Sequence, residues 1–166
     1  MAWPCPSVTI ERGFTVIELV VVIFLMGLLS AMVLIRFSGT SATDELGYSQ
    51  ELASAARYAQ KLALASRCPV RLNLPSATEY SLTRPDSYVA GNCANNFNAQ
   101  VVDPETGQPP YSGNAPAGLT VTANPSFPQT RTFDSQGVIT PDTELLIQVG
   151  GRSIVIRSGS GLVVVQ

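Results

Sequence analysis

The feature that most constrains this chain is an apolar run near its N-terminus. Across residues 14–37, 19 of 24 residues are apolar, and the 17 residues of the stretch 19–35 carry no charge. At about 1.5 Å per residue, a helix of that length reaches roughly 36 Å, enough to cross a hydrocarbon core of roughly 30 Å. Core helices seldom stay apolar on every face for so long. The run therefore predicts a membrane-spanning helix over residues 14–37.

Two other interpretations of this run are a buried core helix and a cleavable secretory signal. Leu29-Ser30-Ala31 would be the cleavage site of such a signal. Glu18 argues against it, because a carboxylate just inside an apolar run costs on the order of 1 to 3 kcal/mol to insert into a membrane. We therefore expect Glu18 to have a function of its own.

Composition excludes several classes of protein. The 166 residues contain no histidine, which excludes Ser/His and Cys/His catalysis and His-ligated zinc. The formal net charge is -2, so the chain lacks the positive electrostatic field of a general nucleic-acid-binding protein. Asp134, Asp142 and Glu144 could chelate calcium, but they lack the ordered spacing of a calcium loop and are better interpreted as solvated turn acids. Since there is no catalytic constellation, we predict no enzymatic activity, no metal site and no cofactor.

The position of prolines indicates where helix gives way to other structure. None of the 62 residues between Pro6 and Pro69 is proline, and the second half of this stretch is rich in alanine with apolar residues at helical spacing. We predict an amphipathic helix over residues 38–67. Gly39 and Gly47 weaken the continuity of the helix and favour a bend or break around residues 38–43.

Beyond this helix, residues 68–166 have the pattern of an antiparallel β-domain. Glycine and proline make up 19 of these 99 residues, and they separate short segments rich in β-formers. The helix is expected to pack on this domain, which predicts an α+β fold. Residues 86–116 form a long insertion with few strand signals and are a candidate for partner contacts. The segments predicted as strands, the last three forming a meander, are 70–74, 80–83, 119–122, 130–133, 145–149, 153–157 and 162–165.

The segment RGFTVIELV, residues 12–20, resembles the processing site of type IV pilin-like proteins. In that family a prepilin peptidase cuts after the glycine and then methylates the new N-terminus. The resemblance implies a discarded leader over residues 1–13, cleavage between Gly13 and Phe14, and N-methylation of Phe14. It also implies that Glu18 pairs with the terminal amine of a neighbouring subunit in a helical fibre.

The same resemblance implies partners and a location. Besides the peptidase, the partners would be other major and minor pilins and the assembly platform of the bacterial inner membrane. The protein would cross that membrane once, with a periplasmic head, before entering a surface pilus or a periplasmic pseudopilus. Cys68 and Cys93 are the cysteines left after leader removal, and in an oxidising periplasm we expect them to form a disulfide. Two free thiols are the alternative.

A second resemblance concerns the kind of pilin. The stretch ELASAARYAQKLALASRCPVR, residues 51–71, is similar to MshC-like minor pilins of the MSHA pilus and to the broader GspH and FimT group of minor pilins and pseudopilins. Phe133-Asp134 before Gly137, and GSGLVVV at residues 159–165, also fit that group. The implied function is to initiate or cap a fibre.

Two alternatives remain within this group. One is a type II secretion pseudopilin of the GspH kind, and the other is a FimT-like minor pilin that binds DNA during uptake. The candidates for a nucleic-acid contact are Arg152 and Arg157. Because the two arginines are five positions apart along the chain, strand alternation would place them on opposite faces unless a bulge intervenes. We therefore predict weak nucleic-acid binding at most.

Overall fold

The computed structural model describes residues 15–34 and 42–166, which fall into two compact units, Met1–Gly39 and Thr40–Gln166. The described part of the first unit is helix α1 (Val16–Leu34). In the ranges described, no helix combines the length and the apolarity needed to cross a membrane. The span expected over residues 14–37 and the expected amphipathic segment 38–67 both begin in residues outside those ranges, and the leader 1–13 lies wholly outside them.

The second unit, which we call the head, is built around helix α2 (Ala42–Ser66). Small residues dominate its buried face, so the backbone of the helix lies close to the strands that it covers. Arg67, directly after the helix, has a φ of 54°, the left-handed conformation in which helices commonly end. The buried residues of α2 are Tyr48, Ser49, Leu52, Ala53, Ala55, Ala56, Ala59 and Ala63.

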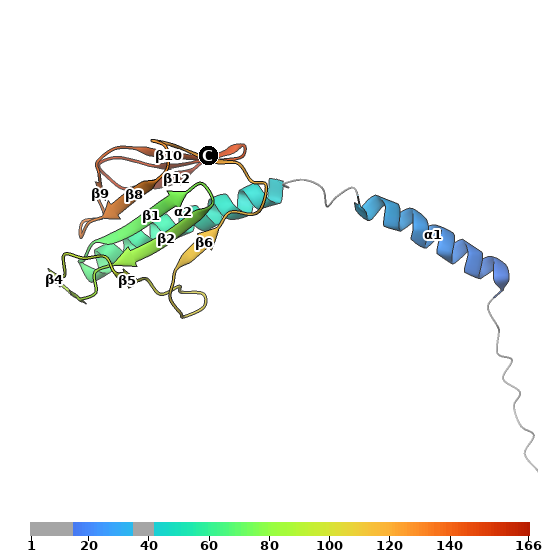
Figure 1. Cartoon of the computed structure of the whole chain (residues 1–166), viewed down its shortest axis with the longest axis horizontal. Helices are drawn as coiled ribbons and strands as arrows, with labels where there is room; N and C mark the ends of the chain where they lie inside the picture. The colour runs from blue at the N-terminus through green and yellow to red at the C-terminus, as the bar shows by residue number, and fades with distance from the viewer. Residues whose placement is uncertain (1–14, 35–41) are drawn as a thin grey trace, which may run out of the picture. The chain divides into compact units, whose positions relative to one another are not determined.

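Two antiparallel sheets pack against α2, and Figure 1 shows the helix lying along β1 and β2. The first sheet has the order β5-β2-β1-β8-β9, with β6 also paired to β2. Its strands are β1 (Val70–Ser76), β2 (Glu79–Arg84), β5 (Ala99–Gln100), β6 (Ser112–Asn114), β8 (Gln129–Phe133) and β9 (Ile139–Thr140).

The second sheet has the order β12-β11-β10-β7. Its strands are β7 (Val121–Asn124), β10 (Leu145–Val149), β11 (Arg152–Ile156) and β12 (Val163–Val165), and a separate hairpin joins β3 (Tyr88–Val89) to β4 (Asn92–Cys93). Strands β10, β11 and β12 form the C-terminal meander that the sequence predicts.

The core lies between α2 and the inward faces of both sheets. Strand alternation selects its residues, because β1 buries Val70, Leu72 and Leu74 while Arg71 and Asn73 between them are half-buried. Strand β10 follows the same rule with Leu145, Ile147 and Val149. The α+β fold predicted from the sequence is confirmed, with a helix packed on antiparallel sheets.

All seven predicted strands are present, with ends that shift by two residues at most. The sequence did not predict β9 or the four short strands of the 86–116 insertion, β3 to β6. Each of these has only two or three residues, which is too short for alternation to be recognised.

Candidate functional site

The N-terminus of α1 is capped by Thr15. The backbone N–H of Glu18 donates to Thr15 Oγ1 (3.3 Å) and to Thr15 O (3.1 Å). The carboxylate of Glu18 therefore lies in the first turn of the helix, where the helix dipole favours negative charge. A threonine followed three residues later by glutamate is the sequence pattern of a capping box. This pattern locates the start of α1, although the sequence analysis did not use it.

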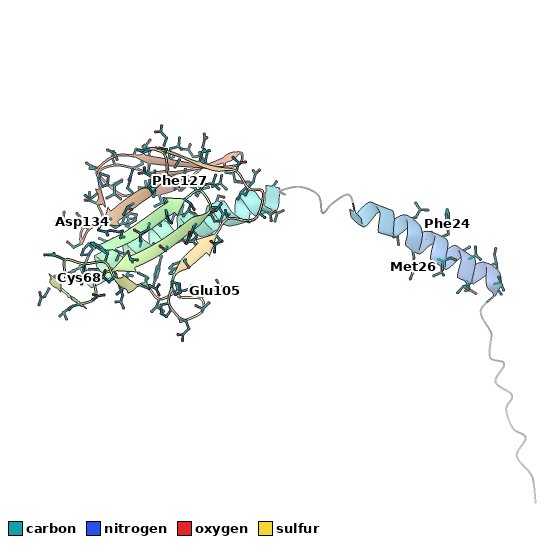
Figure 2. All side chains as sticks on the ribbon, viewed as in Figure 1. Phe24, Met26, Cys68, Glu105, Phe127 and Asp134 are labelled. Atoms are coloured by element: carbon teal, nitrogen blue, oxygen red, sulfur yellow. A yellow bond between two sulfur atoms is a disulfide. The ribbon has the colours of Figure 1, made fainter. Side chains whose placement is uncertain are left out.

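Between Val16 and Leu29, the apolar side chains of α1 are exposed on every side of the helix. The exposed fraction is 80% for Val16 and 68% for Phe24, and Figure 2 shows Phe24 and Met26 projecting from the helix. A continuous apolar surface of this kind is characteristic of a segment that is covered by lipid or by other helices. Gly13 and Phe14, the expected cleavage and methylation site, lie outside the described residues.

The 86–116 insertion is tied to the head in several places. A disulfide joins Cys68, directly after α2, to Cys93 in β4, with the two Cα atoms 5.6 Å apart. The guanidinium of Arg71 lies over the ring of Phe97, 3.7 Å from its centroid. Further along, Val101 N–H donates to Leu82 O (3.2 Å) at the edge of the first sheet. The insertion is thus an ordered extension of the sheet.

Tyrosines and one glutamate connect β2 to α2. The hydroxyl of Tyr80 in β2 donates to Glu51 Oε1 (2.7 Å), and the Tyr80 ring contacts Tyr48 at a centroid distance of 6.3 Å. Burial, with a smaller contribution from Glu51, raises the pKa of Tyr48 to about 12. The pKa of Tyr80 is also raised, by burial and by its hydrogen bond to Glu51. Gly113 in β6 leaves the space that Glu51 and Tyr80 occupy.

Polar side chains of α2 hold the second sheet and turns of both sheets. The Arg57 guanidinium donates to Val163 O through Nε (3.3 Å) and Nη2 (3.1 Å) at the edge strand β12. Gln60 Nε2 donates to Gly137 O (3.0 Å) and Ser160 O (2.9 Å), in two different turns. At the other end of the helix, Gly151 N–H donates to Glu45 Oε2 (3.1 Å). These bonds fix the meander and the turn between β8 and β9 to α2.

Arg131 in β8 is a buried cation, with 2% of its surface exposed. Its guanidinium donates to Gln129 Oε1 (2.9 Å), Thr130 O (3.1 Å) and Thr143 Oγ1 (3.4 Å), while Nε has no hydrogen-bond partner among the described residues. Burial lowers the pKa of Arg131. Its contacts connect β8 to the segment before β10, which gives it a structural role in the head.

The structure does not bring the two candidate nucleic-acid contacts together. Arg152 begins β11 beside the hairpin that Glu45 holds, and Arg157 follows the last residue of that strand. At about 3.3 Å per residue, the two positions are roughly 16 Å apart. They therefore form no compact basic site.

The acidic residues considered for calcium have other contacts. Asp134 Oδ1 accepts the N–H groups of Gln136 (2.8 Å) and Val138 (2.9 Å), so it holds the turn before β9 (Figure 2). Asp142 Oδ1 accepts the Gly159 N–H, and Glu144 is exposed. Over residues 15–34 and 42–166, no group of three or more cysteine or acidic side chains is placed to hold a metal ion.

An exposed apolar helix together with a head of one helix on two antiparallel sheets defines a pilin-like protein. Residues 49–162 match the family described as type II transport protein GspH. Because this match covers well over half of the chain, the protein belongs to the GspH family, a family of minor pilins and pseudopilins.

Two solved structures share the fold. The type IV minor pilin FimU of Pseudomonas aeruginosa is similar with a TM-score of 0.53 and 18% identity, over 75% of this chain and 89% of that chain. The minor pseudopilin EpsH from the type 2 secretion system of Vibrio cholerae is similar with a TM-score of 0.53 and 11% identity, over 74% of this chain and 96% of that chain. At these identities the likeness concerns the fold alone. No curated protein matches the sequence.

Proposed function

We propose that this protein is a minor pilin-like subunit that enters a type IV pilus-like fibre through its N-terminal helix, with a structural and non-enzymatic role in initiating or capping that fibre. The observation that carries the proposal is the match of residues 49–162 to the GspH family. The exposed apolar surface of α1 supports it, because such a surface can pass from lipid to a bundle of helices with little change in hydrophobic free energy.

The proposal includes processing by a prepilin peptidase. Cleavage between Gly13 and Phe14 would leave a methylated N-terminus one residue before Thr15, which caps α1. Before assembly, residues 14–37 would anchor the subunit in the inner membrane with the head in the periplasm, next to the assembly platform. This arrangement is supported by the sequence motif at residues 12–20.

Within the fibre, Glu18 would pair with the terminal amine of a neighbouring subunit. A carboxylate in an apolar bundle is strongly disfavoured unless it is paired, so this contact would set the stagger between subunits. The capping-box pattern of Thr15 and Glu18 offers a competing role, in which Glu18 serves its own helix only. The two roles predict different results for matched variants.

Glu18→Gln tests the pairing, because glutamine keeps the capping-box pattern but removes the charge. We expect this variant to be lost from sheared fibres of cells that assemble the wild-type protein, whereas Thr15→Ala, which removes the cap, should retain most of the incorporation. If Thr15→Ala is lost and Glu18→Gln incorporates normally, Glu18 acts as a cap and not as the partner of an amine.

The kind of fibre is a further part of the proposal. The similarity of residues 51–71 to MshC-like proteins favours a pilus of the MSHA type, whereas the family description favours a type II secretion pseudopilin. Cross-linking followed by co-purification separates them, since the major subunit recovered is a pilin in the first case and a pseudopilin in the second.

DNA capture is the least supported alternative, because Arg152 and Arg157 lie at opposite ends of β11. We expect binding of micromolar affinity or weaker at physiological salt. Tight, salt-sensitive binding in a gel-shift assay that disappears in the Arg152→Ala/Arg157→Ala double variant would contradict this.

A further inference from the structure

A groove of about 280 Å³ lies between the exposed face of α2 and the loop between β5 and β6. Helix residues at one-turn spacing form one wall, and the loop forms the other. The lining residues are Ser54, Arg57, Tyr58, Lys61, Pro104 and Tyr111. None of the lining residues belongs to the Cys68–Cys93 bridge.

Positive charge distinguishes this groove from the rest of α2. Its lining contains two cations, Arg57 and Lys61, and no carboxylate. Like charges four residues apart on a helix destabilise it by about 0.2 to 0.5 kcal/mol. The two hydrogen bonds from Arg57 to Val163 O account for its position, but they do not neutralise its charge.

The shape of the groove is fixed before any partner arrives. The rings of Tyr58 and Tyr111 meet edge to face at a centroid distance of 5.3 Å. Tyr111 is held by its backbone, because its N–H donates to Val101 O (2.7 Å) and its carbonyl accepts the N–H of Leu82 (2.9 Å). An aromatic wall beside two cations suits a carboxylate carried next to an apolar side chain.

The acids nearest in sequence to the groove flank Pro104, and they must be considered as internal partners of the cations. Asp103 holds its own turn, where Oδ1 accepts the Glu105 N–H (2.9 Å) and Oδ2 accepts the Thr106 hydroxyl (3.3 Å). Glu105 is exposed on the loop, as Figure 2 shows. Neither residue lines the groove.

We propose that this groove receives an acidic side chain of a neighbouring pilin-like subunit, whose carboxylate pairs with Arg57 and Lys61 while an adjacent apolar residue packs on the two tyrosines. The inference rests on the proposed function, because it places the contact in an assembled fibre. It gives the 86–116 insertion a function, which is to supply the second wall of a docking site.

The experiment uses the fact that Lys61 is the only lysine of the chain. Cells that assemble the fibre are treated with a zero-length carbodiimide reagent, which couples an amine directly to a carboxylate, and cross-linked peptides are identified by mass spectrometry. We expect Lys61 to be joined to an aspartate or glutamate of another subunit. Lys61→Arg should lose the cross-link and keep incorporation, because it keeps the charge.

Charge reversal gives an independent measurement. We expect Lys61→Glu to lower incorporation into sheared fibres at least about tenfold, because a repulsion replaces an attraction at the contact. Arg67→Glu, which makes the same change at an exposed position outside the groove, should incorporate like the wild type.

Two results would overturn the inference without affecting the proposed function. They are wild-type fibres in which Lys61 is joined only to Asp103 or Glu105 of its own chain, and normal incorporation of Lys61→Glu. Absence of the processed wild-type protein from fibres would instead refute the proposed function and this inference together.

Discussion

Two glycine-to-alanine substitutions are expected to change the stability of the head in opposite directions. At Gly113, an added Cβ would overlap Glu51 Oε1 and the Tyr80 ring, so the Tyr80–Glu51 hydrogen bond would have to break. At Gly47, inside α2, an added Cβ meets nothing within 4 Å. The same methyl group therefore crowds one site and favours the helix at the other.

The magnitudes follow from these environments. A hydrogen bond to a charged group contributes about 1.5 to 3 kcal/mol, and crowding a packed site adds to the loss, so Gly113→Ala should lower the free energy of unfolding by about 2 to 4 kcal/mol. Gly47→Ala should raise it by about 1 kcal/mol, the difference in helix propensity between the two residues. Tyr80→Phe isolates the hydrogen bond, since it removes the donor without crowding.

The assay is urea unfolding of a fragment that begins at Thr40, the first residue of the compact head unit. Tyrosine fluorescence is the appropriate signal, because Trp3 is the only tryptophan of the chain and lies outside this fragment. Equal m values would show that the variants unfold to the same extent. If Gly113→Ala is as stable as the wild type or more stable, the packing described around Gly113 is wrong.

Three further predictions concern the head. Cys93→Ser should lower the free energy of unfolding by about 3 kcal/mol, because the disulfide closes a loop with a sequence separation of 25, and reducing the wild type should have the same effect. Arg67→Gly should raise it by about 0.5 to 1 kcal/mol, since glycine adopts the left-handed φ without strain, and no change would show that Arg67 is not strained. The folded-state pKa of Tyr48, about 12, exceeds its ordinary value of 10.0. The stability that the neutral Tyr48 contributes to the folded state is therefore complete below pH 10.0 and is lost as the pH rises towards 12. Urea titrations across this range should show a fall of about 1.4 kcal/mol per pH unit from this group, which Tyr48→Phe removes.

Strands with clear alternation and sharp turns could be predicted from the sequence. Strand β10 was predicted with its observed ends, because the apolar segment Leu145–Val149 is followed by a Gly150-Gly151 turn. The short strand β9 could not be predicted, because it is defined by its pairing with β8 and has no pattern of its own.

The contacts that organise the head depend on residues far apart in the chain. Gln60 contacts two turns that the sequence places 77 and 100 residues away, so no local pattern could identify it. The docking groove depends in the same way on α2 meeting the loop before Tyr111. Composition could locate the apolar run and the insertion. It could not identify the face of α2 against which the insertion forms the groove. The Thr15–Glu18 cap, in contrast, could have been recognised from the local sequence, but it was not predicted.

The most direct test of the account is the intact mass of the protein extracted from membranes of cells that contain a prepilin peptidase, measured with and without reduction before alkylation. We predict a chain that begins at methylated Phe14 and takes up two alkyl groups after reduction and none before it, because Cys5 leaves with the leader and Cys68 is bonded to Cys93. A chain that begins at Met1, or one cut after Ala31, would contradict the proposal that this protein is a processed pilin-like subunit.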